Sequence, residues 1–96
     1  MIKANKTDFY EKIAALYNLP EGIISDQLRK ILLENAKRLE TEENLYILAD
    51  HLGRFVMAEM IALTCSSPKE LVDLSRYIIE LQKTYRLFSL GLTKID

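Results

Sequence analysis

The chain has 96 residues, of which 49% are apolar and 28% charged, and its formal net charge at neutral pH is −1. A chain of this length forms one domain, which buries roughly 60–65% of the surface that the unfolded chain exposes. The composition excludes a disordered chain, a collagen-like repeat and a disulfide scaffold, and the charge gives no general attraction to nucleic acid or anionic membranes. With 16 Leu and 10 Ile against 2 Val and no Trp, the apolar residues favour helices over sheet.

Two short helices are expected in the amino-terminal part of the chain, over about residues 7–18 and 20–39. The first helix is expected to begin at Thr7 or Asp8, and Asp8 with Glu11 three positions later has the spacing of a capping box. Apolar residues follow at helical spacing in both segments. Pro20 suits the first turn of the second helix, because its missing N–H needs no partner there.

A long helical hairpin is expected in the rest of the chain, over about residues 42–64 and 68–90. Ser67 and Pro68 mark the start of the last helix, since serine is a common cap and proline is common at the first helical position. The connection between the two long helices is so short that they must run antiparallel. The sequence therefore predicts an all-α protein in which residues 1–96 form a single domain of four helices.

Few side chains could support catalysis. His51 and Cys65 are the only histidine and the only cysteine, and fourteen residues of one expected helix separate them, about 21 Å at 1.5 Å per residue. Within one chain they cannot form a nucleophile–base pair or share a metal. The sequence has neither a glycine-rich phosphate loop nor a His-Glu-x-x-His zinc pattern. We therefore expect no enzymatic activity, no metal and no cofactor.

No segment is expected to enter a membrane. The first six residues lack the apolar core of a signal peptide, and the most apolar stretch, residues 55–63, is interrupted by Glu59, whereas a bilayer span needs about 18 apolar residues. A single cysteine forms no internal disulfide, which favours a cytoplasmic location.

Glu59 is unusual because it lies inside the apolar stretch, where an isolated carboxylate is costly to bury. One interpretation places it at the rim of a packed face or pairs it with an arginine. The candidate partners are Arg54, Arg76 and Arg86. The other interpretation makes it a contact in an interface with another subunit or a partner.

Residues 13–30 carry a pattern of their own, Ile-Ala-Ala-Leu-Tyr-Asn-Leu-Pro-Glu-Gly-Ile-Ile-Ser-Asp-Gln-Leu-Arg-Lys. This segment resembles the helix-turn-helix of the sigma-factor region 4 and response-regulator DNA-binding families. The resemblance implies that Ala14 lets two helices pack closely, that Asn18 takes the left-handed turn position, and that the second helix enters the major groove of double-stranded DNA. The DNA-binding residues it suggests, with a nearby lysine for phosphate, are Ser25, Asp26, Gln27, Arg29, Lys30 and Lys12.

The expected hairpin has more apolar faces than one antiparallel neighbour can cover. We therefore predict a homo-oligomer, most simply a dimer, in which residues 41–96 form the oligomerisation hairpin and residues 1–40 contain the helix-turn-helix. The predicted interface residues are Val56, Met60, Leu63, Leu71, Leu74, Ile78, Leu81, Tyr85 and Phe88. This layout resembles that of phage small terminase subunits and small phage or plasmid regulators.

Two functions stay open at this point. The first is a small oligomeric DNA-binding protein, a regulator or a packaging or recruitment factor. The second is a helical protein-interaction module, such as a chaperone, adaptor or inhibitor, whose apolar helical face binds a protein partner without nucleic acid. They differ in a measurable property, because DNA binding through phosphate contacts weakens steeply with salt.

Overall fold

The computed structural model describes residues 5–42 and 44–89, with side chains described up to residue 84. This part of the chain contains helices α1 (Lys6–Tyr17), α2 (Asp26–Arg38), α3 (Leu45–Leu63) and α4 (Lys69–Ser89), and a short 3-10 turn, η1 (Thr64–Ser66). No strand occurs within these residues, so the predicted all-α class is confirmed.

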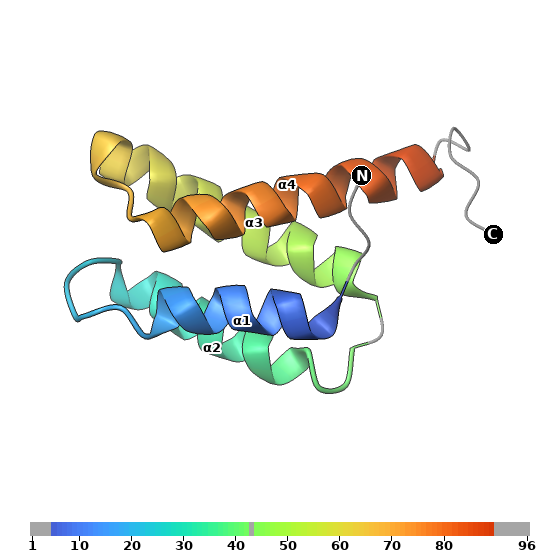
Figure 1. Cartoon of the computed structure of the whole chain (residues 1–96), viewed down its shortest axis with the longest axis horizontal. Helices are drawn as coiled ribbons and strands as arrows, with labels where there is room; N and C mark the ends of the chain where they lie inside the picture. Colours follow the sequence, from blue (N-terminus) through green and yellow to red (C-terminus); the bar gives the residue numbers. More distant parts are fainter. Residues whose placement is uncertain (1–4, 43, 90–96) are drawn as a thin grey trace.

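The four helices run in alternating directions and form an up-and-down bundle (Figure 1). α1 packs on α2 and α4, and α3 also packs on α2 and α4, so each helix has two neighbours and the four close a ring. Within the described residues, no helix combines the length and the apolar character that crossing a bilayer requires.

The core lies along the axis of this ring and takes residues at three-and-four spacing from every helix. Its fully buried side chains include Phe9, Ile13 and Leu16 of α1, Leu28 and Leu32 of α2, Leu48, Leu52 and Val56 of α3, and Leu71, Leu74, Ile78 and Leu81 of α4. Burial of one such side chain contributes about 1.5–3 kcal/mol. Packing of the four apolar faces on one another is therefore the main source of the stability of the bundle.

The first helix begins slightly earlier than predicted, and a different residue caps it. The side-chain oxygen of Asn5 accepts a hydrogen bond from the Asp8 N–H at 3.1 Å, so Asn5 is the N-cap. Asp8 lies in the first turn, where its charge complements the helix dipole. The predicted start at Thr7 or Asp8 therefore lies within two residues of the observed one, but the predicted capping box of Asp8 and Glu11 is wrong.

The second helix begins at Asp26, well after the predicted start at Pro20. The carbonyl oxygen of Pro20 accepts from the Ile23 N–H at 3.3 Å, which forms a turn, and Gly22 has a φ of 89°. This left-handed conformation suits glycine and is incompatible with a right-handed helix. The side-chain oxygen of Ser25 then accepts from the Leu28 N–H at 3.1 Å and caps α2.

Candidate functional site

Two of the cationic side chains predicted to bind DNA have partners within the chain. The guanidinium of Arg29 donates from Nη1 to the carbonyl oxygens of Tyr17 at 2.9 Å and Leu19 at 3.1 Å, and its Cζ lies 4.8 Å from the centroid of the Tyr17 ring. Arg29 therefore closes the carboxyl end of α1, where unpaired carbonyl groups attract a cation. The ammonium of Lys12 lies 5.2 Å from the centroid of the Tyr77 ring, so it faces α4 rather than α2.

The start of α2 is bound by a carboxylate from α3. Glu59 accepts two hydrogen bonds from Ser25, one from the backbone N–H at 2.8 Å and one from the hydroxyl at 2.7 Å. In a capping box, a glutamate three residues after the cap accepts from the N–H of the capping residue. Leu28 occupies that position in α2, and Glu59 supplies the missing acceptor from another helix.

These two hydrogen bonds also correct the expected role of Glu59. Glu59 is partly exposed at the rim of the packed face, and its carboxylate binds Ser25 and forms no ion pair with Arg54 or Arg76 among the described side chains, which do not include Arg86. Arg54 forms its ion pair with Asp50 instead, at 3.7 Å. Glu59 thus ties the beginning of α2 to α3.

The charges and the connection around α2 do not favour DNA binding at its amino end. Asp26, Gln27 and Lys30 are exposed there, but the carboxylates of Asp26 and Glu59 place negative charge where a phosphate would have to approach. The connection spans residues 18–25, whereas the turn of the DNA-binding motif has about three or four residues. Asn18 has a φ of −83°, so the left-handed position implied for it is wrong. DNA binding through this segment remains a prediction.

The residues predicted at an oligomer interface divide into three groups. The first group is fully buried within the core of a single chain: Val56, Leu71, Leu74, Ile78 and Leu81. The second group, Met60 and Leu63, is half-buried and packs against the edge of that core. The side chains of Tyr85 and Phe88 lie outside the described residues. The five buried residues leave no apolar surface for a second subunit, because helices of the same chain cover them.

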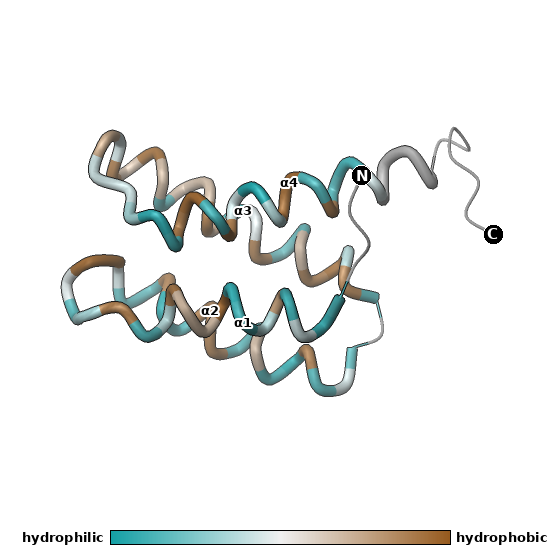
Figure 2. Tube along the Cα trace, in the orientation of Figure 1, coloured by the Kyte–Doolittle hydropathy of each residue, from teal (hydrophilic) through white to brown (hydrophobic). Residues whose placement is uncertain are grey.

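An uncovered apolar surface occurs elsewhere, on the outer face of the last two turns of α3. Ala58, Ile61 and Ala62 are exposed there, and Ile61 is 76% exposed. Earlier on the same face, Asp50 and Arg54 form an exposed ion pair. Figure 2 shows the apolar colours over the end of α3. We call Ala58, Ile61 and Ala62 the α3 end surface.

Ile61 was missed because the segment around it is apolar on every side, a pattern that predicts burial on every side. The spacing of Ile61 from charged residues earlier in the helix indicates that its side chain is exposed. Ile61 lies seven residues after Arg54 and eleven after Asp50, two spacings that return to the same face of a helix. Two charged residues on that face indicate that it points to solvent.

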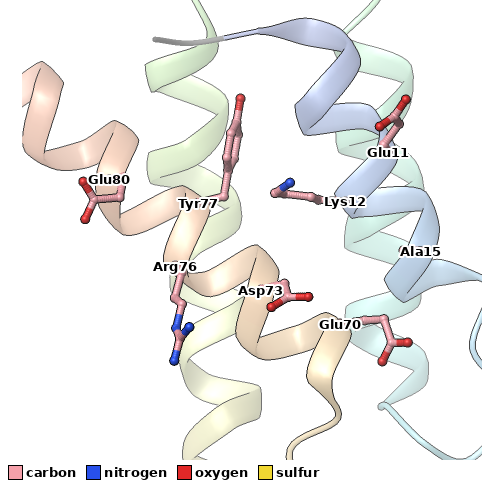
Figure 3. Close-up of a pocket in the computed structure, with 8 residues that line it drawn as sticks. All are labelled: Glu11, Lys12, Ala15, Glu70, Asp73, Arg76, Tyr77 and Glu80. Atoms are coloured by element: carbon pink, nitrogen blue, oxygen red, sulfur yellow. The ribbon is translucent and has the colours of Figure 1, made fainter. Parts of the chain in front are cut away.

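A second surface feature is an open groove of about 400 Å³ between α1 and α4 (Figure 3). It is lined by Ala15, by the ring of Tyr77 and by the charged side chains of Glu11, Lys12, Glu70, Asp73, Arg76 and Glu80. In Figure 3, Lys12 reaches from α1 toward Tyr77, and Asp73 points toward α1, whereas Arg76 points away from it.

Tyr77 is a fixed part of this groove. Its hydroxyl donates to the carbonyl oxygen of Asn5 at 3.2 Å and accepts from the Asn5 N–H at 3.3 Å, and its ring lies 5.4 Å from that of Phe9. Burial raises the pKa of the Tyr77 hydroxyl above 10.0, the Asn5 hydrogen bond partly opposes this rise, and the Asp8 carboxylate adds to it. The ring is thus held between α1 and α4 in its neutral form.

The residues considered for catalysis lie in separate environments. The ring of His51 is half-buried between α2 and α3, where its Nδ1 lies 3.4 Å from Asn35 Nδ2 and its ring packs on Phe55. Cys65 is exposed in η1, beyond the end of α3. Among the described residues, no group of three or more His, Cys, Asp or Glu side chains is arranged to hold a metal ion.

Comparison with protein-family models, with curated proteins and with solved structures finds no match to this chain. Among the described residues, the candidate surfaces include the α3 end surface and the α1–α4 groove.

Proposed function

We propose that this protein is a small helical protein-interaction module that associates with itself, most simply as a dimer, through the α3 end surface. The observation that carries this proposal is the exposure of Ile61, a large apolar side chain that is 76% exposed on a regular, otherwise well-packed bundle. Burying one such side chain contributes about 1.5–3 kcal/mol, and a symmetric contact buries it from both copies.

The surface suits a second copy because it carries no charge that would repel its own image. Glu59 is the only charged residue between residues 55 and 67, and its carboxylate is bound by Ser25. Ala58 and Ala62 leave space on either side of Ile61. The isoleucine of each copy can therefore pack between the two alanines of the other, as a ridge into a groove.

A structural role for the segment that resembles a helix-turn-helix agrees with this proposal. Arg29 stabilises the end of α1, and Glu59 binds the start of α2, so the segment holds the bundle together. We place the protein in the cytoplasm, a reducing compartment in which the exposed thiol of Cys65 persists.

Sedimentation velocity tests the proposal with the intact chain and two matched variants. The wild-type protein is expected to sediment as a dimer, and Ile61→Asp as a folded monomer, because an aspartate in the contact would bury an unpaired charge. The control is Ile47→Asp, since Ile47 is 47% exposed on the first half of α3, near the Asp50–Arg54 ion pair. It is expected to remain a dimer.

The same measurement is repeated with mixed-sequence duplex DNA at low salt. The expected result is that the protein sediments unchanged. A monomeric wild-type protein, or a dimeric Ile61→Asp variant, would overturn the proposed self-association. Co-sedimentation of the protein with DNA would favour the DNA-binding function instead, if the complex dissociates at higher salt and does not form with the Lys30→Ala variant.

A further inference from the structure

The groove between α1 and α4 has the size of a binding site and lies away from the α3 end surface. Its volume of about 400 Å³ falls within the range of about 300–1,000 Å³ typical of ligand pockets. It is open along the two helices, and its lining includes the apolar Ala15 and Tyr77. An elongated ligand such as a polypeptide segment fits this shape better than an enclosed small molecule.

The charged side chains of the groove are mostly acidic, and several lack a partner. Within the described part of the chain, the side-chain carboxylates of Glu11, Glu70 and Asp73 form no hydrogen bond or ion pair, whereas that of Glu80 pairs with Lys83 at 3.5 Å. Arg76 also lines the groove, although its side chain does not reach toward α1 as that of Asp73 does (Figure 3). The four carboxylates of the lining outnumber its two cations, Lys12 and Arg76, so the groove favours a basic ligand over an acidic one.

One cation of the chain already occupies this environment. The ammonium of Lys12 lies 5.2 Å from the centroid of the Tyr77 ring, within reach of a cation–π interaction. This contact is independent of the acidic residues, and it shows that the aromatic face of the groove accepts a basic side chain. The ring itself is fixed by its two hydrogen bonds to Asn5 and is 8% exposed, so a basic side chain of a partner competes with Lys12 for its accessible edge.

We infer that the α1–α4 groove binds a basic segment of a protein partner. Lysine or arginine ammonium and guanidinium groups of the partner pair with Glu70 and Asp73, and their aliphatic stems lie on the exposed Ala15. Glu70 and Asp73 are three residues apart on α4, so they face basic side chains on successive turns of a partner helix. This inference rests on the proposed role in protein interaction but uses a different surface.

The test is a titration of the full-length, ¹⁵N-labelled protein with two alanine-based helical peptides of fourteen residues, one with lysine and one with glutamate at every fourth position. The lysine peptide is expected to shift the amide signals of residues 11–15 and 70–80, and the glutamate peptide to shift none of them. The double variant Glu70→Gln, Asp73→Asn is expected to weaken binding about tenfold, since each partly exposed ion pair contributes about threefold.

Two further variants separate the groove from general charge effects. Glu21→Gln with Glu34→Gln removes the same net charge from exposed positions outside the groove and is expected to leave the affinity unchanged. Lys12→Met removes the competing cation and is expected to tighten binding about threefold. Equal weakening by both double variants, or amide shifts outside the groove, would overturn the inference.

The titration is also carried out in the Ile61→Asp background. Groove binding is expected to persist in that monomer, because the two surfaces share no residue. If the wild-type protein is a dimer but the lysine peptide does not bind, the groove inference is overturned and the proposed self-association is not. A monomeric wild-type protein that still binds the lysine peptide overturns the proposed self-association alone.

Discussion

Replacing Glu59 with alanine is expected to lower the free energy of unfolding by about 2 kcal/mol, although Glu59 contributes no apolar packing to the core. The substitution removes both acceptors that Glu59 presents to Ser25, at 2.8 Å and 2.7 Å. It thereby leaves the N–H of the α2 cap without its partner and breaks the polar link between α2 and α3.

The magnitude follows from the exposure of the two groups. A hydrogen bond to a charged group contributes about 1.5–3 kcal/mol when buried, but here both residues are partly in water, so we assign about 1 kcal/mol to each. Glu59→Gln retains one acceptor, so it is expected to lower the free energy of unfolding by about half as much as Glu59→Ala. The double-mutant cycle with Ser25→Ala is expected to give a coupling energy of about 1 kcal/mol, the contribution of the hydroxyl bond.

The assay is urea unfolding in the Ile61→Asp background, so that self-association does not contribute to the measured stability. Glu34→Ala is the control, because Glu34 is exposed on α2 and is expected to change the stability by less than about 0.5 kcal/mol. A Glu59→Ala variant as stable as this control, or a cycle in which the two substitutions are additive, would refute the tertiary capping role of Glu59.

Two other substitutions test the packing around α1. Arg29→Ala is expected to lower the free energy of unfolding by about 1–2 kcal/mol and Lys30→Ala by less than about 0.5 kcal/mol, because only Arg29 donates to the carbonyls that end α1; equal effects in urea unfolding would contradict this role. The pKa of the Tyr77 hydroxyl is raised above 10.0 in the folded chain, so the hydroxyl loses its proton at a lower pH in the unfolded chain. The folded chain therefore loses stability as the pH rises from 10 through the folded pKa. Tyr77→Phe is therefore expected to show a smaller decrease in melting temperature between pH 9 and about pH 11.5, and a decrease equal to that of the wild type would argue against the shift.

The sequence predicted the existence of all four helices, because the apolar spacing that defines a helical face is local. The start of α2 was wrong because Pro20 is compatible with a turn as well as with a first helical turn. Gly22 and Ser25 decide between the two, since a left-handed glycine ends the turn and the serine caps the helix that follows.

The candidate surfaces were harder to predict because they depend on contacts between distant residues. Periodicity shows that Leu74 and Ile78 are buried, but it cannot show that α1 and α3 of the same chain bury them. The partner of Glu59 lies 34 residues away in the sequence, and no local pattern points to it. The direction of Arg29 likewise depends on where α1 ends.

The contact between α1 and α4 has a consequence for how the chain acquires its structure. The hydrogen bonds between Asn5 and Tyr77 join residues 72 positions apart, and the ring of Phe9 reaches its aromatic neighbour only when α4 is in place. On a translating ribosome, α1 therefore emerges long before the helix that covers its second side, and its apolar face stays open to solvent meanwhile. Contacts of such long range form late and slow folding, so we expect the closure of the ring by α4 to be the last step in forming the bundle.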